Sequence, residues 1–421
     1  MTRYRVVLLL LAISLVGAVL NGRPLWWSMA GAFLALIVVA LIWSWLGVNW
    51  LRLSRRTITR VAQVGQILEE QFTLTNLSGL PKLWVEARDH SSLPSHHASR
   101  VVGWLPGHRF RGWRARTLCL QRGRFTLGPV TLRSGDPLGI YTREREIPNV
   151  STILVYPPTF ELRSFPQPVG YIPGGEALRR RALFVTTNAA GAREYAYGDS
   201  YNRIHWGLTA KRNKLIVKEF DLDPMSEIWI CLDLQRGAHV GEIENIDMTR
   251  DTALELDLST YALPPSTEEY AVAIAATVAR HFVHQERSVG FSTYPNGDHR
   301  EALPADRGER QLNKIMETLA VAHAEGAIPF VRALRAEGAF FPRGATVVTI
   351  SASPDIDWAT GVQQLIRSGN RVVAIVVDGE SFGGEHAMAD IIGALAEAGA
   401  VVRVVRKGEP IAGAIERATV L

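Results

Sequence analysis

Two uninterrupted apolar runs open the chain. Val6 to Leu20 and Leu25 to Trp50 contain no charged residue, and the short break Asn21-Gly22-Arg23-Pro24 separates them. The second run is long enough to cross a hydrocarbon core of about 30 Å. We therefore predict a transmembrane helical hairpin over residues 1–55, in contact with a lipid bilayer. For the first run the alternative is a cleaved signal peptide, but no clear small-residue cleavage site precedes the break, and a second apolar run follows at once.

Charged and aromatic residues at the ends of these runs indicate their orientation. The break holds only Arg23, whereas arginines lie before the first run and after the second, at Arg3, Arg5, Arg52, Arg55 and Arg56. The positive-inside rule then predicts a multi-pass protein of the inner cell membrane with both termini in the cytoplasm. Five tryptophans indicate aromatic belts near both interfaces: Trp26, Trp27, Trp43, Trp45 and Trp50.

Residues 56–160 alternate between apolar and polar positions in short stretches that end in turn clusters. Gln71 to Thr75 is one such stretch, and Gln121-Arg122-Gly123-Arg124 is a hairpin-like turn. Further strand candidates are Leu83–Ala87, Phe110–Leu120 and Arg124–Leu132. The spacing predicts an all-β sandwich domain. Four histidines lie in or near a Ser/Pro-rich loop without metal-ligand spacing, so a zinc site is not expected there: His90, His96, His97 and His108.

Residues 226–421 alternate β-branched runs with helical patterns. The strand candidates are Ile228–Leu234, Ser288–Thr293, Ala345–Ile350, Arg371–Val377 and Ala400–Val405. The helical candidates are Glu268–His284, Arg310–Ala322, Trp358–Arg367, Ala387–Ala398 and Pro410–Arg417. This rhythm predicts an α/β domain with an open parallel sheet and helices on both faces. Because ligands of such sheets bind at the carboxyl ends of strands, the loops after Leu234, Ile350 and Val377 are the expected site.

Residues 161–225 join these regions as a linker followed by a segment dense in charged and aromatic residues. Gly198-Asp199-Ser200 is a turn suited to capping a helix, Ile204 and Leu208 share one helical face, and Leu215 to Phe220 is a strand candidate. One interpretation is a solvated helix–turn–strand with ordinary surface charges. The other is a fixed ionic network in which three cations pair with three carboxylates: Arg193, Arg203 and Lys218 with Glu194, Asp199 and Glu219.

Between Gly191 and Glu219 the chain also carries the pattern G-x-R-x-Y-x-x-G-D-x-x-x-R-I-x-W-x-x-T-A-[KR]-x-x-x-L-x-V-K-E. This pattern resembles the signature of the bacterial domain-of-unknown-function family fifty-eight. Family members commonly sit beside MoxR-type AAA+ ATPases and are described as carrying a von Willebrand factor A-like domain. The resemblance implies a von Willebrand factor A-like, Rossmann-like open sheet over residues 226–421 and no settled biochemical activity. The residues it assigns to an interdomain clamp or docking interface are Arg193, Tyr195, Gly198, Asp199, Arg203, Trp206, Thr209, Lys211, Lys218 and Glu219.

By the same resemblance, a working metal site would place Asp-x-Ser-x-Ser after the first strand, where hard oxygen ligands bind Mg²⁺. Asp233 matches the aspartate, but Gln235 and Gly237 stand in place of the serines. The position of the later aspartate falls near Ala352, and Asp355 is displaced from it. We therefore expect no metal or other cofactor, with Asp233 as the candidate ligand if Mg²⁺ does bind. We interpret Asp233 as a helix-capping or hydrogen-bonded carboxylate at a strand end.

Other features limit the function classes. None of GxxxxGK[ST], GxGxxG and HExxH occurs, and no nucleic-acid-binding motif accompanies the net charge of +5. The one GxSxG sequence, Gly379 to Gly383, is followed only by His386, which lies ahead of Asp390 and so gives the wrong order for a Ser-acid-His triad. Cys119 and Cys231 lie in apolar strand-like runs and are expected to be buried free thiols in a reducing compartment. The sequence therefore predicts a protein that is not an enzyme.

We predict a membrane-anchored cytoplasmic scaffold or adaptor that binds a protein partner, and by resemblance the partner is a MoxR-type AAA+ ATPase or its client. The alternative is a Mg²⁺-dependent adhesion module or enzyme centred on Asp233. A purely structural membrane protein is the third hypothesis, and it predicts no specific partner.

Overall fold

The computed structural model describes residues 3–58, 61–166, 189–195, 206–212, 214–220, 227–241 and 263–417. Its contacts divide the chain into two compact units. The first unit comprises residues 1–160, 240–277 and 313–323, and the second comprises residues 161–239, 278–312 and 324–421. The domain boundaries predicted from the sequence at residues 55, 160 and 225 stay predictions.

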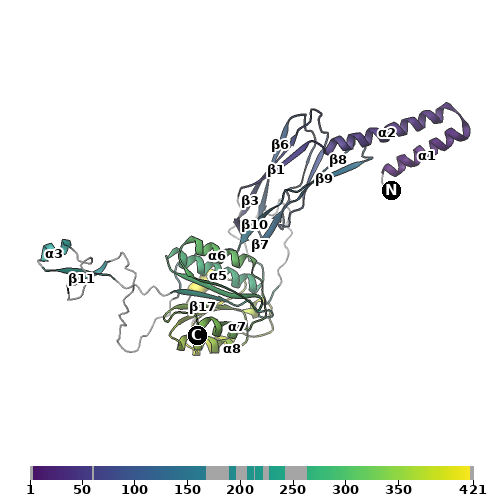
Figure 1. The fold of residues 1–421 in the computed structure, drawn as a ribbon. Coiled ribbons are helices and arrows are strands. Elements are labelled where there is room, and N and C mark those ends of the chain that lie inside the picture. The colour runs from purple at the N-terminus through teal and green to yellow at the C-terminus, as the bar shows by residue number, and fades with distance from the viewer. Residues whose placement is uncertain are drawn as a thin grey trace. The chain divides into compact units, whose positions relative to one another are not determined.

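The first unit opens with two apolar helices, α1 (Arg3–Asn21) and α2 (Pro24–Val48), as the apolar runs predict (Figure 1). Both are long and apolar enough to cross a membrane. Small residues bring them together: Ser14, Gly17 and Ala18 are buried, and a Cβ added at Gly17 would lie 2.6 Å from the Trp26 ring.

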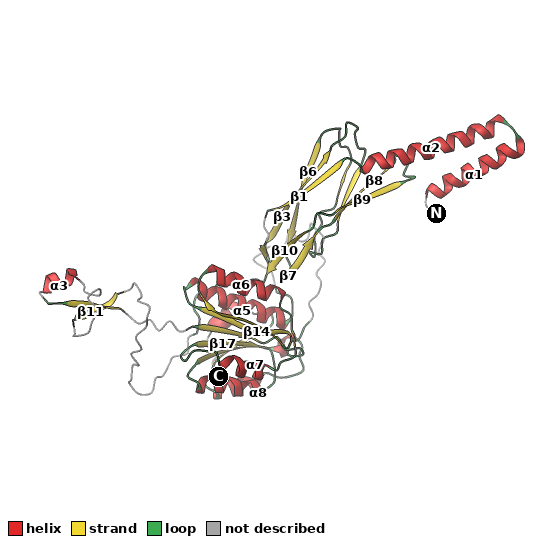
Figure 2. Cartoon of the chain, in the orientation of Figure 1, coloured by secondary structure: helices red, strands yellow, loops and turns green. Residues whose placement is uncertain are grey.

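The rest of this unit is rich in strands, drawn in yellow in Figure 2. They are β1 (Leu51–Thr57), β2 (Val61–Gln63), β3 (Ile67–Asn76), β4 (Val85–Asp89), β5 (Arg100–Val102), β6 (Phe110–Leu118), β7 (Gly123–Leu127), β8 (Val130–Gly135), β9 (Thr142–Ile147) and β10 (Ser151–Tyr156). They form three sheets, with the orders β1-β3-β6, β2-β10-β7 and β5-β4-β8-β9. The predicted strand Arg124–Leu132 is wrong as a single element: it is divided between β7 and β8 at Gly128-Pro129, where proline has no N–H for a ladder bond.

Alternation on the strands builds the apolar cores of this unit. β3 buries every second residue, including Leu68, Phe72 and Leu74. One core packs Phe72 and Leu74 against Val85 and Leu132, so that the sheets of β3 and β4 enclose it. A second core gathers residues around Leu68, among them Cys119.

The second unit is built on a mixed seven-stranded sheet. Its strands are β13 (Ile228–Leu232), β14 (Val289–Gly297), β15 (His299–Asp306), β16 (Glu325–Gly326), β17 (Thr346–Ser351), β18 (Arg371–Val377) and β19 (Val401–Val405). The order is β15-β14-β13-β17-β18-β19, with β16 paired to β14. The expectation of an all-parallel sheet is wrong at one edge, because β15 runs antiparallel to β14. β15 is polar and mostly exposed and contains Pro304, features that suit an edge strand. Because its sequence lacks an alternation of apolar and polar residues, it was not predicted as a strand.

Helices complete this part of the chain: α5 (Thr267–His284), α6 (Glu309–Val321), α7 (Phe330–Gly338), α8 (Asp357–Arg367), α9 (Ala389–Glu397), α10 (Ile411–Glu416) and the short 3₁₀ turn η3 (Gly379–Phe382). Figure 1 shows α7 and α8 along one face of the sheet. Trp358 of α8 packs on Phe330 of α7 in the core beneath β17 and β18. Cys119 and Cys231 are both buried and free, as predicted.

Candidate functional site

The carboxyl ends of β13 and β17 meet where the sheet changes direction. The chain leaves β13 toward β14 on one side, and it leaves β17 toward β18 on the other. In open α/β sheets, ligands bind in the crevice at such a switch point. Asp233 directly follows β13 and Ser351 ends β17, and the Asp233 backbone N donates to Ile350 O at 2.9 Å. Two of the loops expected to form a site are thus side by side.

Protein groups occupy both carboxylate oxygens of Asp233, which is only 2% exposed. Ser351 Oγ donates to Oδ2 at 2.6 Å, and the Gln235 backbone N donates to Oδ1 at 3.0 Å. His239 Nε2 donates to the Asp233 carbonyl oxygen at 2.9 Å. Burial raises the pKa of the Asp233 carboxyl above its ordinary value, while the nearby His239 and the Ser351 hydrogen bond oppose that rise. Asp233 is therefore a hydrogen-bonded carboxylate at a strand end.

The groups around Asp233 do not fit a Mg²⁺ site. Gln235 contributes a backbone N–H, which is a donor, and Gly237 has no side chain. Asp355 accepts a hydrogen bond from the Asp357 backbone N at 3.0 Å, at the start of α8. In the part of the chain that the structure describes, no group of three or more His, Cys, Asp or Glu residues is placed to hold a metal ion. Mg²⁺ demands near-octahedral oxygen coordination, which this donor set does not supply.

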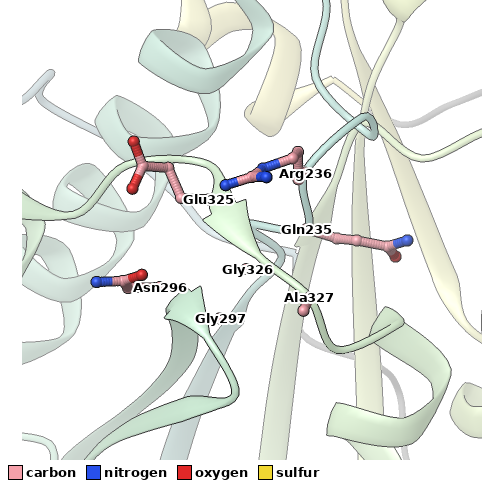
Figure 3. Close-up of a pocket in the computed structure, with 7 residues that line it drawn as sticks. All are labelled: Gln235, Arg236, Asn296, Gly297, Glu325, Gly326 and Ala327. Atoms are coloured by element: carbon pink, nitrogen blue, oxygen red, sulfur yellow. The ribbon is translucent and has the colours of Figure 1, made fainter.

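A shallow pocket of about 270 Å³ opens beside this switch point. Gln235, Arg236, Asn296, Gly297 and residues 325–327 line it (Figure 3). In that view the Arg236 side chain extends toward the side of the pocket where Glu325 and Asn296 lie. Gly326 is required here, because a Cβ would collide with the carbonyl oxygens of Tyr294 and Leu234. The pocket offers polar contacts and one cation, but no nucleophile paired with a base.

Ser381, in the one GxSxG sequence, lies in η3 with its hydroxyl occupied. Its Oγ donates to Asp378 O at 2.7 Å and accepts from the Lys407 backbone N at 3.0 Å. Asp378 in turn pairs with Arg406 at 3.2 Å. Neither hydrogen bond of Ser381 comes from a histidine, so the geometry is that of a strand-to-helix loop and not of a nucleophile elbow.

The signature segment contains a two-stranded antiparallel ribbon and a short helix. These are β11 (Ala189–Glu194), β12 (Ile216–Phe220) and α3 (Trp206–Arg212), so the predicted strand at Leu215–Phe220 is confirmed to within one residue. The Tyr195 backbone N donates to Leu215 O at 2.8 Å. Thr209 Oγ1 accepts from the Ile216 backbone N at 3.1 Å and so fixes α3 to β12. Trp206 is 67% exposed and Lys211 is exposed.

The rest of the predicted interface set is described less fully. The backbones of Arg193, Lys218 and Glu219 lie in the ribbon, where Arg193 pairs with Val217. Gly198, Asp199 and Arg203 lie outside the described residues. The ionic network expected among these side chains therefore stays a prediction.

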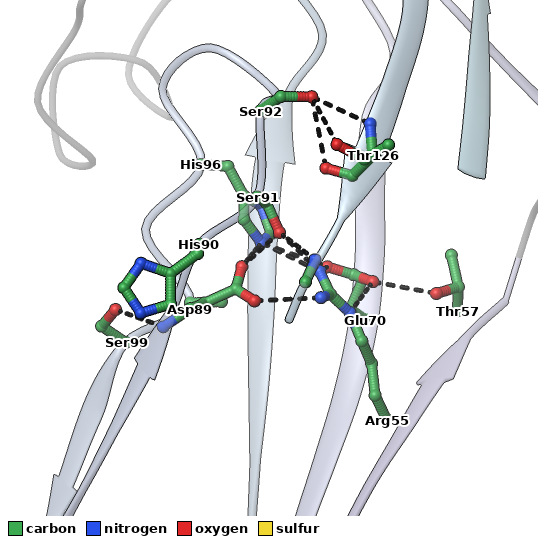
Figure 4. Close-up of polar contacts among 12 residues, drawn as sticks. Arg55, Thr57, Glu70, Asp89, His90, Ser91, Ser92, His96, Ser99 and Thr126 are labelled. Atoms are coloured by element: carbon green, nitrogen blue, oxygen red, sulfur yellow. Dashed lines mark hydrogen bonds and ion pairs between the residues drawn. The ribbon is translucent and has the colours of Figure 1, made fainter. Parts of the chain in front are cut away.

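The first unit contains a buried ionic network that was not predicted from the sequence (Figure 4). Arg55 Nε and Nη2 donate to the two oxygens of Glu70, each at 2.8 Å, and Nη1 donates to Asp89 Oδ1 at 3.0 Å. His96 Nε2 lies 2.9 Å from Asp89 Oδ2 and 3.3 Å from Glu70 Oε2. All four side chains are at most 3% exposed. Burial alone would raise the pKa of Asp89, but hydrogen bonds from His96 and Ser91 and the Arg55 charge lower it below its usual range.

The sequence does carry a signal for this network. Glu70 occupies the inward phase of β3, together with Leu68 and Phe72, and Arg55 continues the inward phase of Leu51 and Leu53 on β1. A charged residue at such a position requires a buried partner of opposite charge. The sequence indicates that His96 lies in or near a loop without metal-ligand spacing. The structure places it in this ion-paired cluster, where its Nδ1 also lies 2.7 Å from Thr117 Oγ1.

Arg122 forms a second buried ionic cluster within the first unit. Its Nη2 donates to Glu268 Oε1 at 2.6 Å and to Ala322 O at 2.8 Å, and its Nη1 lies 2.5 Å from Glu269 Oε1. Burial raises the pKa of Glu269, while the charge of Arg122 opposes that rise. The hydrogen bond that His323 Nδ1 donates to Glu268 raises the pKa of His323. Glu268 and Glu269 lie in the first turn of α5, where carboxylates complement the helix dipole. They also ion-pair Arg122, which the sequence predicts to lie in a hairpin-like turn.

The chain combines two apolar helices, a β-rich region and a mixed α/β sheet. At the switch point of that sheet, protein groups occupy the Asp233 carboxylate. The chain matches the model of the family described as "Protein of unknown function DUF58" over residues 191–381, the region that begins with the signature pattern. It is 21% identical over 220 residues to "Uncharacterized protein YeaD" of Bacillus subtilis (strain 168), which covers 51% of this chain and 47% of that protein. The chain thus spans about half the length of this curated relative.

Parts of the chain are also similar to solved structures. The hypothetical protein BatB from Bacteroides thetaiotaomicron is 15% identical at a TM-score of 0.28, covering 44% of this chain and 91% of that one. The pilus adhesin SpaC from Lactobacillus rhamnosus GG is 8% identical at a TM-score of 0.31, and the match covers 45% of this chain and 29% of that one. The CARDB domain of PF1109 from Pyrococcus furiosus is 16% identical at a TM-score of 0.19, and the match covers 25% of this chain and 86% of that one. TM-scores this low do not define the fold of either unit.

Proposed function

We propose that this chain is a membrane-anchored cytoplasmic scaffold or adaptor, without enzymatic activity, whose signature segment binds a protein partner. The proposed partner is a MoxR-type AAA+ ATPase or its client, as the family resemblance implies. The observation that carries the proposal is the exposure of Trp206 within the region that defines the family. Tryptophan is enriched among residues that dominate binding energy at protein interfaces.

The local structure around Trp206 supports a preformed docking surface. Ile216 and Val217 of β12 are buried, whereas Trp206 and Lys211 of α3 are exposed. The hydrogen bond from Ile216 to Thr209 ties α3 to the ribbon, so that the aromatic ring is presented from an ordered element. An interface that is ordered before binding loses less conformational entropy on association.

Contacts within the first unit support the proposed topology of two spans with both termini in the cytoplasm. Arg3 Nη1 lies 3.5 Å from Leu138 O, and the Tyr4 ring stacks on Tyr141 at 5.7 Å. The start of α1 therefore lies beside the β-rich region, and α2 leads directly into β1. Because both helices contact one folded region at these ends, we propose that both ends lie on one side of a bilayer, and the arginine distribution supports the cytoplasm as that side.

The strand order supports the proposal that the α/β region is von Willebrand factor A-like. Numbered from β13, and leaving out the two-residue β16, it reads 3-2-1-4-5-6, the order of classical doubly wound sheets. Asp233 stands after the first strand of that order, where the resemblance places the metal-site aspartate. In our proposal the site has lost its metal ligands and the sheet serves as a binding platform.

Replacing Trp206 with alanine is expected to weaken partner capture about thirtyfold, as for an interface hot spot. The measurement is the dissociation constant between the full-length protein in nanodiscs and the purified MoxR-type ATPase of the same genome. Trp104→Ala is the matched control, because Trp104 is 51% exposed in the first unit. Equal affinity of the wild type and Trp206→Ala would remove the signature segment from the interface, and no binding by either would remove this partner.

The alternative function, a Mg²⁺-dependent adhesion module or enzyme, is favoured by the position of Asp233 at the switch point. Calorimetric titration of the full-length protein with Mg²⁺ and Mn²⁺ separates the two proposals. Because Ser351 and Gln235 occupy the carboxylate, we expect no saturable binding at millimolar metal. Saturable binding that is lost in Asp233→Ala would favour the metal-dependent alternative over the scaffold.

A further inference from the structure

A shallow cavity of about 580 Å³, open to the surface, lies at the end of α2, within the first unit. Its walls come from the last turn of α2 and the residues that follow it, from β1, from Leu77 after β3, and from β9. The lining residues are Trp45, Asn49, Trp50, Leu51, Arg52, Leu53, Leu77, Arg145 and Ile147. The cavity thus combines aromatic, aliphatic and guanidinium groups.

The depth of this cavity in a bilayer follows from the length of α2. A helix of 25 residues is about 37 Å long, which exceeds a hydrocarbon core of about 30 Å. The last turn of α2 therefore emerges at the level of lipid headgroups. Trp45 and Trp50 meet edge to face there, with ring centroids 5.1 Å apart, as tryptophans do in the interfacial belt.

Hydrogen bonds from Lys82 and Asn49 hold the end of α2. Lys82, only 3% exposed, donates from Nζ to Leu46 O at 2.5 Å and lies 5.7 Å from the centre of the Trp50 ring. Asn49 Nδ2 donates to Trp45 O at 2.8 Å. Both interactions satisfy carbonyl groups that the helix end leaves without partners. Trp50 itself has φ of 57°, a conformation that non-glycine residues seldom adopt, in the turn from α2 into β1.

Two arginines provide the charge of this cavity. Arg52 lies on β1 between the buried residues Leu51 and Leu53, and Arg145 lies on β9 two residues before Ile147. Both are exposed, and among the described residues no carboxylate lies within ion-pairing distance of either guanidinium. Two unpaired guanidinium groups beside an aromatic and aliphatic wall match a ligand with a phosphate group and an apolar tail.

We propose that this cavity binds the phosphate-bearing headgroup of an anionic phospholipid. Arg52 and Arg145 contact the phosphate, while Trp45, Trp50 and Leu77 pack against the first carbons of the acyl chains. The inference rests on the proposed membrane insertion of α1 and α2. It adds a specific lipid site at the point where the anchor meets the β-rich region.

The test uses the delipidated full-length protein in detergent and native mass spectrometry with three probes: phosphatidylglycerol, phosphatidylcholine and soluble sn-glycerol 3-phosphate. The wild type is expected to bind phosphatidylglycerol at least tenfold more tightly than phosphatidylcholine. The double variant Arg52→Gln/Arg145→Gln is expected to bind phosphatidylglycerol roughly thirtyfold more weakly, from the contribution of about two cationic side chains. Arg52→Lys/Arg145→Lys keeps the charge and is expected to retain most of the binding.

Arg114→Gln/Arg124→Gln is the charge-matched control, because both residues are exposed on β6 and β7 and neither lines the cavity. Equal affinity for the two phospholipids, or equal loss in the control, would overturn the proposal. Glycerol phosphate bound as tightly as phosphatidylglycerol would overturn the lipid as the source of the phosphate. Alkaline carbonate extraction of the same protein from membranes tests the anchor separately: extracted protein refutes the anchor, whereas retained protein without lipid preference refutes only the cavity site.

Discussion

Replacing Arg55 with leucine is expected to lower the free energy of opening of strand β3 by about 3–5 kcal/mol. The change leaves Glu70 and Asp89 in the interior without the guanidinium that bonds to both. It also removes the cation that lies 5.1 Å from the centre of the Phe72 ring. The measurement is hydrogen exchange of the β3 peptides, read by mass spectrometry on the full-length protein in detergent.

The same strand supplies a matched control for the Arg55 prediction. Arg116 pairs with Glu69 at 2.7 Å on β3, but its side chain is 54% exposed. An exposed ion pair of this kind contributes less than about 1 kcal/mol, so Arg116→Leu is expected to leave the exchange of β3 nearly unchanged. If Arg55→Leu and Arg116→Leu had equal small effects, the buried network would not be holding β1, β3 and β4 together.

The parts of the fold that the sequence predicted are those with strong periodicity. Strand Arg371–Val377 has the predicted bounds, because its β-branched run is buried almost throughout and is bounded by Gly369 and by Asp378-Gly379. The polar edge strand β15 and the helix α7 lacked such a signal. On α7 the inward position of Glu337 interrupts the apolar face, and the structure supplies its partners in Arg300 and Tyr294, at 2.6 and 2.9 Å. Local patterns show that a residue faces inward, but they do not identify its partner.

The candidate site shows the same limit. Asp233 was identifiable because it follows an apolar strand and matches the first position of a metal-site sequence. Its bond to Ser351 was not predictable, since 118 residues separate the two along the chain. Only the parallel register of β13 with β17, in which Leu232 pairs with Ile350, brings them together. Arg122 was likewise read as a turn residue because its acidic partners begin a helix 146 residues later.

Replacing Arg122 with methionine is the second change for which we expect a large effect. Methionine preserves much of the buried volume but removes the guanidinium between Glu268 and Glu269 and leaves, among the described residues, only His323 beside them, in surroundings that already raise the pKa of Glu269. We expect the free energy of opening at the start of α5 to fall by about 3 kcal/mol. Hydrogen exchange of peptides covering residues 267–277 in the full-length protein is then expected to accelerate on the order of a hundredfold.

Two further variants test whether the lower free energy of opening at the start of α5 comes from the unpaired carboxylates. Arg122→Met/Glu269→Gln removes one of the two like charges, so its exchange is expected to return part of the way toward that of the wild type. Arg124→Met, two residues along in exposed surroundings on β7, is expected to have no measurable effect. Exchange at the start of α5 that is as slow in Arg122→Met as in the wild type would show that the cluster does not stabilise this helix. Equal acceleration in the single and double variants would assign the loss to packing around the arginine stem instead of to charge.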